Sequence, residues 1–139
     1  MSWRMTFGYS LLLAVAFMEY FAKVVGDKLT FLAIDASAPL LQDLQEAFGK
    51  STSHAVGHGV AFMVGCAGTF AFVLPCSLLP SHPLKRIASV LVMTVPVEVA
   101  MLYGGDAPNG IAGWAAALQP AAGAALAAIT TLRIGRFRD

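Results

Sequence analysis

The sequence predicts an all-α protein with four transmembrane helices and a short amphipathic surface helix in its first outer loop, all within a single domain. Three observations lead to this fold class. Of the 139 residues, 58% are hydrophobic and only 12% are charged, whereas soluble domains carry about 25% charged residues. Four segments are apolar and long enough to cross the lipid hydrocarbon as helices, which takes about 20 residues. Positive residues cluster at alternate connections between these segments, as the positive-inside rule requires.

The first predicted span covers about residues 6–25. Its apolar run follows Arg4, and no clean small-residue cleavage site comes after it. We therefore expect a retained helix rather than a signal peptide. Glu19 and Lys23 lie near the far end of this span, and their i, i+4 spacing favours an ion pair that stabilises the helix end.

The first connection, residues 26–52, contains a short amphipathic segment at about residues 39–48. Apolar side chains recur there at helical spacing, with acidic and amide side chains on the opposite face. Pro39 suits the first turn of such a helix, and Gly49 suits its end. We expect this helix to lie on the membrane surface or against a partner.

The second predicted span, about residues 53–79, has no charged residue and carries two histidines at its start. His54 and His58 are four residues apart and therefore share one face of the helix. A second face, offset from the histidines, is lined by small residues that let helices pack closely in lipid. These small residues are Gly57, Ala61, Gly65 and Thr69.

The third and fourth predicted spans, about residues 84–104 and 111–132, each contain one polar side chain of interest. Glu98 lies well inside the apolar run of the third span, and Gln119 lies near the middle of the fourth. The fourth span also carries a stripe of small residues, which predicts a second close-packing face. This stripe consists of Gly113, Ala117, Ala121 and Ala125.

The basic residues indicate how the four spans are oriented. They precede the first span, separate the second from the third, and follow the fourth. Six of the nine lysines and arginines follow this pattern, namely Arg4, Lys85, Arg86, Arg133, Arg136 and Arg138. Lys28 and Lys50 lie in the first connection, where acidic residues offset them. This pattern predicts a multi-pass protein of the bacterial inner membrane with both termini in the cytoplasm. With a net charge of +1 and no basic tract, the chain offers no surface for nucleic acid. The expected partners are membrane lipids and other membrane protein subunits.

The polar residues of the spans leave several interpretations open. The simplest role for His54 and His58 is to cap their helix at the interface, but one of them could hold a pigment, a quinone or a haem. Glu98 is either a protonated or hydrogen-bonded interior carboxyl or part of a functional site, because an ionisable residue inside a membrane is costly. Gln119 is a further candidate for binding a ligand. No zinc-ligand spacing occurs, so we predict no metal site and no resident cofactor.

The layout of four helices, with a histidine opening the second and an acid within the third, resembles the VanZ-like family of small bacterial membrane proteins. That family shows Asp-Lys-x-x-His-x-x-x-Tyr/Phe at the start of its second helix. His58 and Phe62 match this motif, whereas His54 and Ala55 replace the Asp-Lys pair. Glu98 matches the family's glutamate, but Met101 replaces the glutamine one turn later.

The resemblance implies a role in the chemistry of envelope lipids or phosphates, with His58 and Glu98 as an acid–base pair. The Asp-Lys pair and an arginine that would hold an anionic head group are missing here, so we lean against catalysis. Our first hypothesis is a non-catalytic accessory or structural subunit of a larger respiratory or photosynthetic complex, which docks through its small-residue helix faces. The alternative is a VanZ-like protein that binds or processes a lipid-linked anionic substrate.

Overall fold

The computed structural model describes residues 3–20, 28–103 and 108–136, and these residues form helices and short connections without a β-strand. The five helices are α1 (Trp3–Tyr20), α2 (Thr30–Phe48), α3 (Lys50–Ser77), α4 (Pro83–Tyr103) and α5 (Gly110–Arg136). The all-α prediction is confirmed. The end of the predicted first span, including Lys23 and its proposed ion pair with Glu19, lies outside the described residues.

Two of the described helices, α3 and α5, are long and apolar enough to cross a membrane. They correspond to the second and fourth predicted spans, and they favour association with a membrane. The described parts of α1 and α4 fall short of the same combination of length and hydropathy. The four-span topology therefore stays a prediction.

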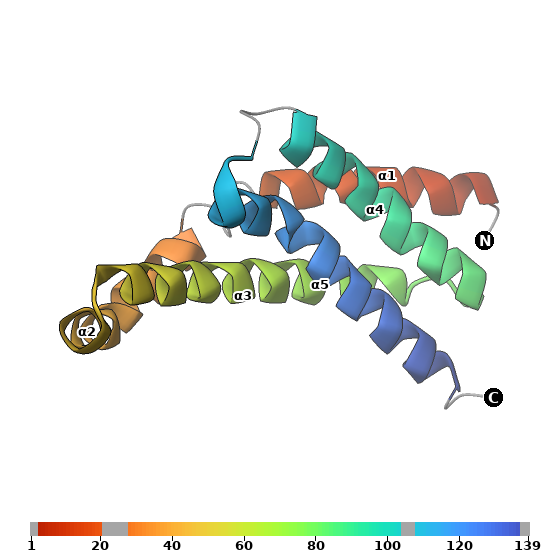
Figure 1. Ribbon diagram of the computed structural model, residues 1–139. Coiled ribbons are helices and arrows are strands. Elements are labelled where there is room, and N and C mark those ends of the chain that lie inside the picture. Colours follow the sequence, from red (N-terminus) through yellow and green to blue (C-terminus); the bar gives the residue numbers. More distant parts are fainter. Residues whose placement is uncertain (1–2, 21–27, 104–107, 137–139) are drawn as a thin grey trace.

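Helices α1, α3, α4 and α5 pack into a bundle in which α5 lies against both α3 and α4, and α1 lies mainly against α4. Figure 1 shows that the starts of α1 and α4 and the ends of α3 and α5 lie at the same end of the bundle. The basic residues Arg4, Lys85, Arg86 and Arg133 belong to these helix ends. We call this the basic end.

The core of the bundle joins residues from all four helices. One cluster of buried side chains contains Ala14, Val73, Val90, Met93, Ala124 and Ala127. A second cluster packs Phe17 against Val97, and the rings of Phe17 and Phe72 lie 5.1 Å apart between their centroids. Burial of this apolar surface stabilises the bundle wherever the same side chains would otherwise be exposed to water rather than to lipid.

Helices α3 and α5 pack closely where they cross. A Cβ atom at Gly123 would lie 2.6 Å from the carbonyl oxygen of Cys66 and 2.5 Å from Cβ of Thr69. Only glycine fits there without moving the backbone of α3. Farther toward the basic end, the buried hydroxyls of Ser77 and Thr131 form a 2.8 Å hydrogen bond between the same two helices.

The prediction of a helix limited to residues 39–48 was wrong, because α2 begins at Thr30 and runs through Pro39. Proline removes one N–H donor from the ladder but leaves the chain helical when other contacts support it. Ser37 donates its hydroxyl to the carbonyl oxygen of Ala33 at 2.8 Å within this stretch. Helix α2 packs against α3, and this support lets the helix extend beyond its clearest amphipathic pattern.

Helices α2 and α3 form a hairpin joined by Gly49 alone. Gly49 has φ +89° and ψ 167°, a conformation that is essentially restricted to glycine, so its predicted role as the end of the helix is confirmed. The hydroxyl of Ser53 donates to the carbonyl oxygen of Leu41 at 2.7 Å and ties the two helices together.

The hairpin projects from the bundle (Figure 1). The 28 residues of α3 give a length of about 42 Å, which exceeds the roughly 30 Å of lipid hydrocarbon. Within the described chain, α2 packs only against α3, and none of its residues is buried. We call α2 and the first two turns of α3, residues 30–57, the arm.

Candidate functional site

The two histidines lie in a groove between the start of α3 and the start of α5. His54 and His58 line it together with Phe62, Ile111 and Ala115, and its volume is about 520 Å³. Both histidines are exposed, and the other walls are mainly small and apolar. The shared helix face predicted from their spacing therefore forms one wall of an open groove, which we call the histidine groove.

The histidine groove continues along α5 into a second apolar hollow of about 770 Å³. Phe62, Ile111 and Ala115 line both, and Trp114 and Leu118 belong to the second. Ile111 is 92% exposed and Trp114 is 50% exposed. Trp114 was missed in the sequence, although its spacing from Ile111 and Leu118 already places the three residues on one helical face.

The chemistry of the histidine groove is limited by what surrounds the imidazoles. Among the described residues, no group of three or more histidine, cysteine or acidic side chains could hold a metal ion. One imidazole could still act as a single axial ligand to a metal-centred ring, as predicted for a pigment or a haem. The apolar walls equally fit a lipid tail or a neighbouring helix.

Glu98 lies elsewhere, in a cavity of about 270 Å³ between α4 and α5. Thr94, Val95, Ala121 and Ala125 are among the residues that line it with Glu98. Both carboxylate oxygens are buried, and neither has a hydrogen-bond partner of ordinary geometry in the described chain. The backbone of Ala121 is the polar group of α5 that approaches the carboxylate. We call this space the Glu98 cavity.

The structure does not bring His58 and Glu98 into one site. The histidine groove lies between α3 and α5, whereas the Glu98 cavity lies between α4 and α5, and no residue lines both. Ala121 lines both the Glu98 cavity and the apolar hollow that continues the histidine groove, but the groove itself and the cavity face different parts of α5. An acid–base pair acting on one substrate has no support in this arrangement.

Gln119 packs inside the bundle rather than in any of these spaces. Its side-chain amide lies directly over Gly65, where a Cβ atom would collide with it. Its backbone carbonyl accepts a hydrogen bond from the thiol of Cys66 at 3.7 Å. Gln119 therefore helps to join α3 to α5, which is a structural role.

Some of the residues predicted to form packing faces pack against other parts of this chain, and others are exposed. Gly65 and Ala117 are buried, while Gly57 faces the side chain of Leu41 and Gly113 lies against Pro108. Ala61 is half-buried. Ala121 and Ala125 are exposed and line the Glu98 cavity.

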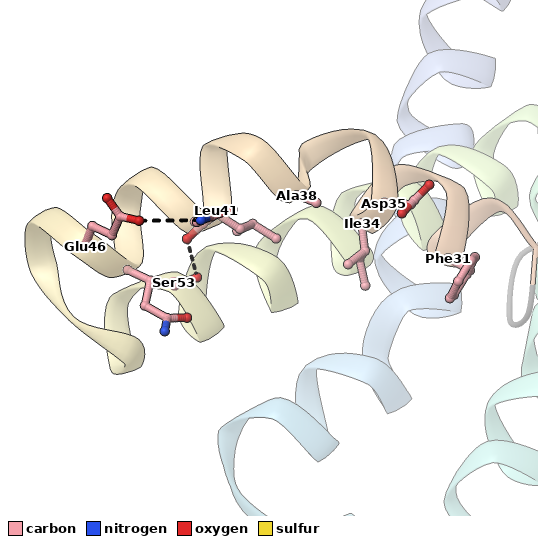
Figure 2. Close-up of a pocket in the computed structure, with 9 residues that line it drawn as sticks. Phe31, Ile34, Asp35, Ala38, Leu41, Glu46 and Ser53 are labelled. Carbon is pink, nitrogen blue, oxygen red and sulfur yellow. Dashed lines mark hydrogen bonds between the residues drawn. The ribbon is translucent and has the colours of Figure 1, made fainter.

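The arm carries its own hollow, of about 540 Å³, between α2 and the start of α3. Figure 2 shows Phe31, Ile34 and Asp35 toward one end of this hollow and Leu41, Ser53 and Glu46 toward the other, where Ser53 hydrogen-bonds to Leu41. Gln42 donates to Glu46 at 3.5 Å. Acidic and apolar side chains therefore alternate along this surface, which suits a partner better than it suits lipid alone.

Comparison of the chain with protein-family models, curated proteins and solved structures finds no match.

Proposed function

We propose that this chain is a non-catalytic accessory subunit of a larger bacterial membrane complex, respiratory or photosynthetic in kind. In this proposal α1, α3, α4 and α5 span the inner membrane. The basic end and both termini face the cytoplasm, following the positive-inside rule. The arm then lies at the outer surface, where it meets another subunit.

The observation that carries the proposal is the uncovered arm. Helix α2 has no buried residue, and it leaves large apolar side chains open. Phe31 is 69% exposed, Leu40 is 56% exposed and Phe48 is 71% exposed. Large apolar side chains that no other part of the described chain covers are available to contact a partner. The arm also carries four acidic side chains or amides at its hollow, which gives a partner specific groups to recognise.

The VanZ-like alternative would require the residues that match that family to meet at a substrate. His58 and Glu98 line separate spaces, and the positions of the Asp-Lys pair hold His54 and Ala55. These observations favour the subunit over a protein that processes a lipid-linked anion.

A pair of arm variants tests the proposal. The double substitution Leu40→Gln and Phe48→Gln removes exposed apolar surface without touching the bundle. The tagged chain is purified gently from its own membranes, and the proteins recovered in stoichiometric amounts are quantified. We expect recovery of the partner to fall at least about tenfold, a loss of about 1.4 kcal/mol.

The matched control is Asp43→Asn, an exposed residue of α2 that lines none of the described hollows. It should leave recovery unchanged. If the unaltered chain brings no other polypeptide in stoichiometric amounts, the proposed function is wrong. If the double variant recovers the partner in full, the arm is not its docking surface.

A further inference from the structure

The Glu98 cavity is incomplete in a way that the rest of the bundle is not. Both carboxylate oxygens are buried, and the backbone N–H of Ala121 approaches them without reaching ordinary hydrogen-bond geometry. By contrast, the hydroxyls of Ser77 and Thr131 have partners in each other and in the carbonyl oxygens of Leu74 and Ala127. Leaving a buried acceptor unpaired costs free energy, and more so for a carboxyl group than for a neutral one. The cavity therefore lacks a well-placed donor at this position.

The walls of the cavity identify what kind of group is missing. Thr94 already donates its hydroxyl to the carbonyl oxygen of Val90 at 2.7 Å, and the remaining walls are aliphatic side chains. A hard metal cation takes six or more oxygen ligands, which these walls do not supply. A basic side chain brings its own donors, and a guanidinium can bond both carboxylate oxygens at once.

The rim of the cavity fits a helix. Ala121 and Ala125 are exposed and four residues apart on α5, and exposed Leu91 and Val95 stand opposite them on α4. Small residues at i, i+4 spacing let a neighbouring helix approach closely in lipid. The exposed small residues Ala121 and Ala125 and the carboxyl group of Glu98 are independent features, and all three line the same cavity.

A second copy of this chain does not complete the cavity by symmetry. A two-fold contact places the same surface on both partners, so one carboxyl group would face another. The described basic side chains also stand at or near helix ends or beside connections, as with Lys50, Lys85 and Arg133. No basic side chain of the described residues lines the cavity, which favours a complement from a different polypeptide.

We propose that the cavity between α4 and α5 receives a transmembrane helix of a partner subunit, which pairs an intramembrane lysine or arginine with Glu98. This inference rests on the proposed function and names the chemistry of the partner. Glu98 lies five residues before Tyr103, the last residue of α4, which corresponds to about 8 Å along the helix. The basic residue of the partner therefore lies in the outer part of its own span.

The first test compares four variants of the tagged full-length chain, purified from its own membranes. Glu98→Gln removes the charge, and Ala125→Leu fills the rim. Glu19→Gln, on the exposed side of α1, and Ala116→Leu, on an exposed face of α5 outside the cavity, are the controls. Removal of one member of a buried charge pair should lower recovery of the partner at least about tenfold, and neither control should change it.

The second test excludes a loss that is due to misfolding. Once mass spectrometry has identified the partner, Glu98→Lys is combined with a lysine- or arginine-to-glutamate change in the partner's span. Restored recovery in the double variant, but in neither single variant, supports a direct charge pair. A partner without a basic residue in its spans, or full recovery with Glu98→Gln, overturns this inference.

The two proposals fail differently. If the unaltered chain recovers a partner that is insensitive to Glu98→Gln and to the charge exchange, only the Glu98 inference fails. If the unaltered chain recovers no stoichiometric partner, the proposed function itself fails. A crosslink from Glu98 to Lys23 of the same chain would also overturn the inference, because the donor would then be internal.

Discussion

The two sides of α5 are built differently. On the side that meets α3, Gly123 and Thr69 bring the helices into direct contact, and the Ser77–Thr131 hydrogen bond joins their ends. On the side that meets α4, a cavity of about 270 Å³ stays open beside Glu98, whose carboxylate oxygens are unpaired in the described chain. One side is complete within this chain, and the other is not.

The difference separates contacts that the chain makes within itself from a surface that the proposed partner would cover. Native proteins pair nearly all of their buried polar groups, and each exception calls for an explanation. The packed side of α5 explains why the bundle holds together. The open side and the uncovered arm are the two places where another subunit would contribute contacts.

The largest effect is expected on the packed side, from Gly123→Ala. The new methyl group meets the backbone carbonyl of Cys66, which cannot move without moving α3. Overpacking of this kind costs about 3 kcal/mol, which exceeds the gain in helix propensity from alanine. Thermal unfolding of the purified chain in detergent measures the loss.

The control for this substitution is Gly59→Ala, because a Cβ atom there meets nothing within 4 Å. It should leave the unfolding temperature unchanged or raise it slightly. If both variants unfold at the same temperature, the close crossing of α3 and α5 is wrong.

A smaller effect of opposite sign is expected on the open side, from Glu98→Leu in the isolated chain. Leucine has a similar volume and removes a buried carboxyl that has no described partner. We expect a gain of about 1 kcal/mol in the free energy of unfolding, measured in the same detergent. A loss of stability would mean that Glu98 is already satisfied within the chain.

The smallest effect is expected from Thr131→Val, which keeps the shape of the side chain but removes the hydroxyl that bonds to Ser77 and to the carbonyl oxygen of Ala127. Hydrogen bonds between helices in membranes contribute about 0.6 kcal/mol on average. A double-mutant cycle with Ser77→Ala isolates this contribution. A coupling energy of zero would place the two hydroxyls apart and weaken the contrast between the two sides of α5.

Much of the helical framework could be predicted from the sequence. Apolar runs predicted four of the five described helices, and Gly49 predicted the end of α2. The structure explains the second success, because the backbone of Gly49 adopts a conformation reserved for glycine. The start of α2 was not predicted correctly, because proline is common in the first turn of a helix and Pro39 therefore favours a start at that residue. The packing of α2 against α3 is a tertiary effect, which local sequence rules do not include.

The sites were harder to predict than the helices. Helical spacing correctly placed His54 and His58 on one face, where they line one groove. Spacing alone gives no rotation of one helix relative to another, so it could not show that Glu98 faces a different space from His58. For the same reason the importance of Gly123 could not be predicted. Alanine and glycine occur on all faces of α5, and only the contact with α3 distinguishes Gly123 from the other small residues.

Native mass spectrometry of the complex extracted from its own membranes tests the central claim most directly. The account predicts a stoichiometric assembly that contains this chain and at least one other membrane polypeptide. That polypeptide should carry a lysine or arginine in the outer part of a transmembrane helix. A monomer or a small homo-oligomer with bound lipid alone would contradict the account.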